Sequence, residues 1–262
     1  MESTQQGSPL RFDGKVVIVT GGGRGVGRGI ATGFLDAGAE VIVCGRKETS
    51  ELPRSFDGHR ALFVQADVRE LEAVDRVIAF ATERFGRLDV LVNNAGGSPQ
   101  AEAATASPRF SQSIVALNLL APLHLSQRAN AVMQAQAWGG AIVNIASVSG
   151  TRPSPGTAAY GAAKAGLLNL TQSLAIEWAP RVRVNAIVAG LVRTEQSAMH
   201  YGDEVGIERV AATVPLGRLA TPEDIAHACL WLASPLSAYV TGAALRVDGG
   251  GEIPAFLSAR DS

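Results

Sequence analysis

Tyr160 and Lys164 stand four residues apart in a segment whose pattern predicts a helix, so both side chains fall on one helix face. Ser147 precedes Tyr160 by thirteen residues and follows the apolar run Ala141–Ile145. These three residue types suit the reduction of a carbonyl. A phenol can donate the proton, an ammonium lowers the phenol's pKa by stabilising phenolate, and a hydroxyl can orient the carbonyl oxygen. The spacing alone also fits a core tyrosine beside a solvated lysine.

A glycine-rich turn, Thr20–Gly27, has the sequence TGGGRGVG and joins the buried-strand run Val16–Val19 to a helical pattern. Glycines let the backbone approach a pyrophosphate closely, and a helix N-terminus offers unpaired N–H groups and the positive end of the helix dipole. The fit is G-x-x-x-G-x-G through Gly21, Gly25 and Gly27, because neither G-x-G-x-x-G nor a Walker pattern matches. The turn predicts a dinucleotide site, against the alternative of a plain strand–helix connection.

The end of the second predicted strand indicates which nicotinamide cofactor is used. An NAD site places an acidic residue there for the ribose 2′-hydroxyl. Here Arg46 and Lys47 follow the strand, and Glu40 lies at its other end. Arg24 in the glycine turn can reach the same place, and a guanidinium forks onto a phosphate. We therefore expect NADP(H) to be favoured over NAD(H), unless these charges are merely solvated.

Strand-length apolar runs alternate with longer helical patterns along the whole chain. The expected strands are Val16–Val19, Val41–Cys44, Ala61–Val64, Val90–Val92, Ile142–Ile145, Val182–Val188 and Ala244–Val247. After the first helix, the expected helices are Leu71–Phe85, roughly Phe110–Trp138, Tyr160–Trp178 and Pro222–Leu232. This alternation predicts an α/β doubly wound domain with a parallel sheet covered on both faces. We expect one domain over residues 11–262 after a disordered tail, residues 1–10.

Composition excludes several other classes of function. The net charge of −1 gives no basic field for nucleic acid and no polybasic membrane patch. The sequence has no stretch of about 18 apolar residues, so we expect no membrane span. Cys44 and Cys229 lie in apolar runs, typical of buried thiols in a reducing cytoplasm. The histidines are scattered, so we expect no metal site.

Several short motifs together resemble one family. They are Thr20–Gly27, Asp67-Val68, Asn93–Gly96, Asn118, Ser147 and Tyr160-x-x-x-Lys164. Over about Lys15–Gly250 the chain resembles the short-chain dehydrogenase/reductases, and it is similar to the 3-oxoacyl-carrier-protein reductases among them. The resemblance implies a single Rossmann domain, a mostly parallel seven-stranded sheet, and a cytoplasmic homotetramer. Its contacts would come from helices near Leu117–Val132 and Gly166–Trp178 and from the strand Ala244–Val247.

The resemblance also assigns roles residue by residue. The implied catalytic residues are Asn118, Ser147, Tyr160 and Lys164. The implied cofactor-binding residues are Gly21, Arg24, Gly25, Val26, Gly27, Arg46, Asp67, Val68, Asn94, Ala95, Gly96, Tyr160, Lys164, Gly190 and Thr194. In the family, Asn118 bends its helix and its backbone carbonyl holds a water near the lysine. Asp67 and Val68 match positions that contact the adenine, although Asp67 fits a turn residue equally well.

The chain departs from the family pattern in two places. Ala189-Gly190 stands where the family has Pro-Gly, which leaves the loop at the nicotinamide amide less rigid. The segment Glu48–His59 is short and contains Pro53 and Gly58, so we expect the usual third helix to be truncated there.

The predicted function is hydride transfer between NADP(H) and a ketone or secondary alcohol, with a small-molecule substrate. Substrate walls are expected from Gly97–Gln100, Ser149–Pro155 and Gln196–Pro215, the last a mobile helical flap. Arg152 either attracts an anionic group, such as the carrier end of a 3-oxoacyl thioester, or is a solvated rim charge. Hydroxysteroids, terpenoid ketones and sugars or polyols are further candidates. The alternatives are a non-catalytic dinucleotide-binding sensor or scaffold and a sugar-nucleotide epimerase, which would need a longer C-terminal domain.

Overall fold

Seven strands pair into one sheet in the order β3-β2-β1-β4-β5-β6-β7. Each pairing is parallel, which confirms the expected doubly wound fold. The structure is a computed structural model that describes residues 10–258, so the expected disordered tail lies, apart from Leu10, outside the described residues. The strands are β1 (Val16–Thr20), β2 (Glu40–Gly45), β3 (Leu62–Gln65), β4 (Val90–Asn93), β5 (Gly140–Ser147), β6 (Val182–Ala189) and β7 (Ala244–Val247).

The inner strands are mostly apolar and almost entirely buried because helices cover both faces of the sheet. In β1, Val17 and Val19 join one buried cluster and Val16 and Ile18 join the other. Alternating side chains of one strand therefore supply two separate cores. This is why a run of consecutive apolar residues predicts a strand here.

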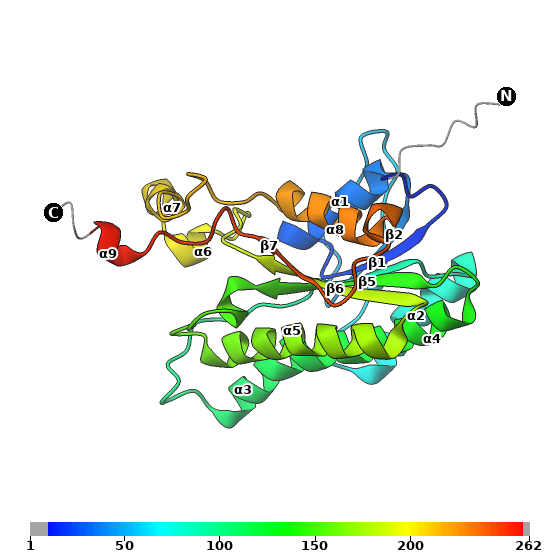
Figure 1. Cartoon of the computed structure of the whole chain (residues 1–262), viewed down its shortest axis with the longest axis horizontal. Helices are drawn as coiled ribbons and strands as arrows, with labels where there is room; N and C mark the ends of the chain where they lie inside the picture. The colour runs from blue at the N-terminus through cyan, green and yellow to red at the C-terminus, as the bar shows by residue number, and fades with distance from the viewer. Residues whose placement is uncertain (1–9, 259–262) are drawn as a thin grey trace.

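The helices form a layer on each side of the sheet (Figure 1). Helices α1 and α8 pack on one face, and α2, α4 and α5 lie on the other. The helices are α1 (Gly25–Asp36), α2 (Leu71–Phe85), α3 (Pro108–Val115), α4 (Ala121–Ala135), α5 (Ala158–Trp178), α6 (Ala198–Tyr201), α7 (Glu204–Ala211), α8 (Pro222–Ala233) and α9 (Ala255–Ser258). The flap expected over residues 196–215 is thus helical, through α6 and α7.

The helix expected over roughly Phe110–Trp138 is not continuous in the structure. The region 110–138 contains α3, a π-helical turn at Ala116–Leu120, and α4, which ends at Ala135. Pro122 has no N–H to donate to the carbonyl of Asn118 four residues earlier, so a regular α-helical bond is lost there. The expectation of no full helix in residues 48–59 is confirmed, since that segment holds only an isolated bridge from Arg54 to Arg60.

The strand order reverses between β1 and β4, and this switch point positions the site. In parallel α/β sheets, ligands bind beyond the carboxyl ends of the strands at such a point. The register pairs Asn93 with Asn144, and Ser147 with Ala189. The ends of β1, β4, β5 and β6 therefore reach the same edge of the sheet.

Candidate active site

Ser147 and Tyr160 meet at this edge. Ser147 ends β5, and its Oγ accepts a hydrogen bond from the N–H of Ser149 at 3.2 Å. Tyr160 lies in the first turn of α5, and the Ser147 hydroxyl is close enough to its phenol to influence the pKa of that phenol. The structure thus brings together a strand-end hydroxyl and a helix phenol that are thirteen residues apart in the sequence.

Lys164 lies one turn further along α5 and is buried, with 3% of its surface exposed. Its Nζ donates to the carbonyl of Ile145 at 2.7 Å and lies 5.6 Å from the centre of the Tyr160 ring. Burial disfavours the charged amine and lowers the pKa of Lys164 to about 8. The expected sharing of one helix face by Tyr160 and Lys164 is confirmed.

The pKa of Tyr160 is raised, whereas the sequence predicts that the neighbouring ammonium lowers it. Burial raises the pKa of the Tyr160 phenol, and the hydrogen bond with Ser147 opposes that rise. The Tyr201 phenol raises it further. The Lys164 amine points to a backbone carbonyl. The surroundings of Tyr160 therefore favour the neutral phenol over the phenolate.

Asn118 is fully buried in the π-helical turn, and hydrogen bonds of its side-chain amide fix its position. Its Nδ2 donates to the carbonyls of Ile114 and Gly97, each at 2.9 Å, and its Oδ1 accepts from the N–H of Gly97 at 2.9 Å. A Cβ at Gly96 would lie 2.7 Å from Asn118 Oδ1 and 3.3 Å from Lys164 Nζ. Glycine at position 96 therefore lets Asn118 and Lys164 approach the same place.

The glycine turn adopts the conformation that its sequence predicts. Gly21 and Gly25 have φ of +64° and +52°, a region that favours glycine. A Cβ at Gly27 would lie 2.4 Å from the carbonyl oxygen of Gly21, so a side chain has no room there. Thr20 Oγ1 accepts from the N–H groups of Asn94 and Ala95, each at 2.9 Å. This side chain of Thr20, used in the sequence only as the start of the motif, fixes the two neighbouring turns to each other.

A carboxylate occupies the N-terminus of α1. The N–H of Gly25 donates to Oε1 of Glu195 at 2.9 Å, across 170 positions of sequence. A negatively charged group at a helix N-terminus is stabilised by the dipole and the unpaired N–H groups. The contact with Glu195 shows that the N-terminus of α1 accommodates a negatively charged group. Sequence reasoning missed Glu195; its only signal was its position next to Thr194.

A polar cavity of about 460 Å³ lies at the carboxyl ends of β2 and β3. Neither Arg24 nor Arg46 forms an ion pair with any residue in the range 10–258. The Asp67 carboxylate is held by Arg69, whose Nε donates at 2.9 Å and whose hydrogen bonds lower the pKa of Asp67. Val68 is buried beside it. The cavity is lined by Arg46, Gln65, Ala66, Asp67 and Arg76.

The loop after β6 keeps the glycine that the family pattern requires. A Cβ at Gly190 would lie 2.7 Å from the Cα of Asp248, which leaves no space for a side chain. Thr194 follows in the same loop, and its side chain lies beside Gly25, 3.6 Å from where a Cβ would be. Thr194 N–H donates to Oγ of Ser197 at 2.8 Å. The hydrogen bonds around Thr194 anchor the loop where Ala189 replaces proline.

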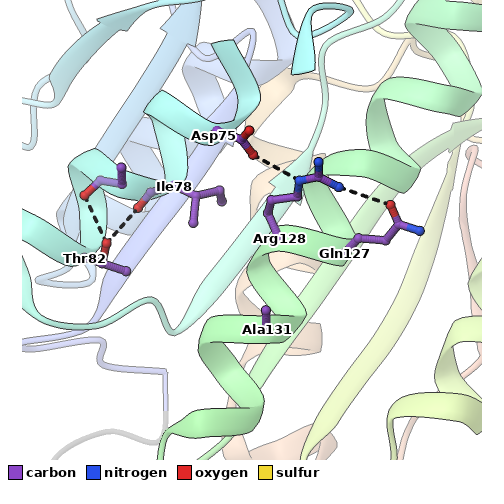
Figure 2. A pocket seen from close by; sticks show the side chains of 7 residues that line it. Asp75, Ile78, Thr82, Gln127, Arg128 and Ala131 are labelled. Carbon is purple, nitrogen blue, oxygen red and sulfur yellow. Dashed lines mark hydrogen bonds and ion pairs between the residues drawn. The ribbon is translucent and has the colours of Figure 1, made fainter. Parts of the chain in front are cut away.

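A second and larger cavity, of about 760 Å³, lies between α2 and α4. Figure 2 shows Arg128 of α4 reaching across to Asp75 of α2, with Nε 3.0 Å from Oδ1. Neither helix carries an expected catalytic residue, so this cavity is separate from the site around Tyr160.

Comparisons with known proteins agree with this geometry. A family model described as "Enoyl-(Acyl carrier protein) reductase" matches residues 21–252. An uncharacterized oxidoreductase of Mycobacterium tuberculosis is 39% identical over 251 residues, 94% of this chain and 95% of the relative. A 3alpha-hydroxysteroid dehydrogenase of Mediterraneibacter gnavus is 38% identical over 92% of this chain and 98% of its own length. The ligand-free structure of Thermoplasma acidophilum aldohexose dehydrogenase has a TM-score of 0.85 at 31% identity, covering 93% of this chain and 95% of that one.

The chain belongs to the short-chain dehydrogenase/reductase family of NAD(P)-dependent oxidoreductases. The expectation of an enzyme is confirmed, and the alternative of a non-catalytic sensor or scaffold has no support. Within residues 10–258, no helix has the length and apolar character needed to span a bilayer.

Proposed function

We propose that this enzyme transfers hydride reversibly between NADP(H) and a ketone or secondary alcohol, with Tyr160 as the acid/base. The observation that carries the proposal is the proximity of the Ser147 hydroxyl to the Tyr160 phenol, with the buried Lys164 amine 5.6 Å from the centre of the Tyr160 ring. During reduction Tyr160 gives its proton to the carbonyl oxygen, and during oxidation it takes the proton from the alcohol. The nicotinamide ring, when bound, supplies or accepts the hydride.

The surroundings of Tyr160 suit both halves of this task. Its raised pKa keeps the phenol protonated before the reduction, as a proton donor must be. Once the proton has left, the Lys164 ammonium 5.6 Å from the ring centre stabilises the phenolate. The Ser147 hydroxyl orients the carbonyl oxygen, because it already reaches the phenol that must protonate that oxygen.

Asn118 supports proton supply to Lys164. Its side chain is saturated by Gly97 and Ile114, so it acts as a positioning residue for the backbone around it. Pro122 withholds the N–H that would bond the Asn118 carbonyl in an α-helix. That carbonyl is therefore suited to hold a water that passes protons to Lys164.

The chain's own residues fit a nicotinamide dinucleotide, as Glu195 at the glycine turn indicates. The pyrophosphate would lie at Gly21, Gly25, Val26 and Gly27. Asp67, Val68, Asn94, Ala95 and Gly96 would flank the adenosine and the ring, Lys164 and Tyr160 would hold the nicotinamide ribose, and Gly190 and Thr194 would meet the nicotinamide amide.

Preference for NADP(H) rests on two arginines that form no ion pair with a carboxylate among residues 10–258. Arg24 and Arg46 flank the place of the ribose 2′-position, and β2 ends at Gly45 with no acid there. A guanidinium there would bind the 2′-phosphate through its planar fork. Tighter binding of NADH than NADPH in separate titrations would overturn this preference.

The reaction is tested by following NADPH absorbance with a panel of ketones. Wild-type enzyme is expected to oxidise NADPH with some members, and Tyr160→Phe to bind NADPH but oxidise it about 10²- to 10⁴-fold more slowly. No turnover with any ketone, or turnover by the Tyr160→Phe enzyme at the wild-type rate, would refute the proposal. We further propose a cytoplasmic homotetramer built on α4, α5 and β7, where Ile176 of α5 is 82% exposed in the single chain. Light scattering measures that state.

A further inference from the structure

On the substrate side of the sheet, an ion pair links two segments that lie far apart in the sequence. Arg152 follows the short helix Val148–Gly150 after Ser147, and Glu252 follows β7. Nη2 of Arg152 donates to Oε1 of Glu252 at 2.6 Å, across 100 positions of sequence. Each side chain is nearly two-fifths exposed. The pair therefore lies at the surface and joins the loop after the catalytic serine to the C-terminal segment.

The same C-terminal segment is bonded to the helical flap. The N–H of Ile253 donates to the carbonyl of Thr213 at 2.7 Å, and the N–H of Leu216 donates to the carbonyl of Gly249 at 3.1 Å. Glu252 lies between these two backbone contacts. The two expected substrate walls, residues 149–155 and 196–215, are thus connected to each other through Glu252.

Tyr201 places this connection next to the reacting phenol. Burial raises the pKa of the Tyr201 phenol, the Glu252 carboxylate raises it further and Arg152 lowers it, so all three polar groups lie within electrostatic reach of one another. Tyr201 in turn raises the pKa of Tyr160. A substrate whose carbonyl meets Tyr160 would carry its other groups toward Tyr201 and the ion pair.

The guanidinium of Arg152 already has a carboxylate partner, which weakens its attraction for a second anion. Nη1 donates to the carbonyl of Pro153 at 3.0 Å and Nη2 donates to Glu252, so both terminal nitrogens of the fork are engaged. An incoming carboxylate or phosphate would have to share the guanidinium with Glu252 and would face that carboxylate at close range. Neither sequence alternative for Arg152, an anion anchor or a solvated rim charge, included this carboxylate partner, and both stay predictions.

We propose that the Arg152–Glu252 pair determines substrate specificity, selecting uncharged ketones and secondary alcohols and rejecting those with a carboxylate or phosphate close to the reacting carbon. This inference rests on the proposed function. A neutralised pair presents polar atoms for hydroxyl or ether groups, whereas a like charge opposite Glu252 is unfavourable.

The test compares two ketones of nearly equal shape, 4-oxocyclohexanecarboxylate and its methyl ester. The acid-to-ester ratio is measured as a ratio of dissociation constants in the presence of NADPH, in a Tyr160→Phe background. Wild-type residues at 152 and 252 should favour the ester. Glu252→Gln, which frees Arg152, should shift the ratio about fivefold toward the acid, and Arg152→Gln should shift it further toward the ester. The double variant should return near the starting ratio.

Asp75→Asn is the matched control, because it frees Arg128 at the remote cavity between α2 and α4 (Figure 2). It should leave the ratio unchanged. An acid-preferring starting enzyme, or a Glu252→Gln ratio equal to that of Asp75→Asn, would overturn the proposal. Because binding is the readout, an enzyme that reduces no ketone refutes the proposed function and leaves this comparison intact. Thermal unfolding of each variant confirms that it is folded.

Discussion

Removing the charge of Glu195 is expected to tighten cofactor binding. Its carboxylate accepts a hydrogen bond from Gly25 at 2.9 Å, at the helix end where the pyrophosphate would lie, so the two anions compete for one position. A carboxylate at an exposed helix N-terminus is worth about 0.3–1 kcal/mol. A dinucleotide that displaces Glu195 therefore binds with a free energy that is less favourable by that amount. Glu195→Gln should therefore lower the dissociation constant of NADPH about two- to fivefold.

The same change should tighten NADH equally, because both cofactors carry the pyrophosphate. The gain should shrink at high salt, since Glu195 is exposed. The assay is a fluorescence or calorimetric titration of each cofactor at two salt concentrations. Glu204→Gln is the matched control, because it removes an exposed carboxylate from the same flap that pairs with Arg193 instead. Unchanged or weaker cofactor binding in Glu195→Gln, or a gain of equal size in Glu204→Gln, would refute the reasoning.

Three further outcomes follow from the site. Because burial lowers the pKa of Lys164 to about 8, its ammonium is lost as the pH rises through 8, so kcat/KM for ketone reduction should fall above that pH; a profile flat to pH 10 would contradict this. Gly96→Ala places a Cβ 2.7 Å from Asn118 Oδ1, so urea unfolding should show a loss of about 1–3 kcal/mol and turnover should drop, while wild-type stability with full activity would argue against the packing. Arg46→Ala should weaken NADPH about tenfold and leave NADH within twofold, and equal weakening of both would exclude a 2′-phosphate contact.

The parts of the fold that follow from local chemistry are predictable from the sequence. Val16–Val19 reads as a strand because both of its faces are buried, and this condition needs no knowledge of the partners. The glycine turn is predictable because positive φ at Gly21 and Gly25 excludes most side chains. Tyr160 and Lys164 share a face through the helix repeat alone.

The remaining features depend on contacts between distant segments. The π-helical turn is stabilised by hydrogen bonds between Asn118 and Gly97, which lie 21 positions apart, and Pro122 was the one local sign of it. Glu195 meets Gly25 only once the sheet is assembled, and the same is true of the Arg152–Glu252 pair. The raised pKa of Tyr160 reflects burial, which spacing along a helix does not reveal.

The central claim is that Tyr160 protonates the carbonyl oxygen while hydride moves to the carbon. Its most direct test is a single-turnover experiment with NADPH deuterated at the transferring position, a ketone identified from the panel, and wild-type or Tyr160→Phe enzyme. Wild-type enzyme should give alcohol with one deuterium on the carbinol carbon, and Tyr160→Phe, with NADPH still bound, should be about 10²- to 10⁴-fold slower. Deuterium transfer by Tyr160→Phe at the wild-type rate would contradict the account.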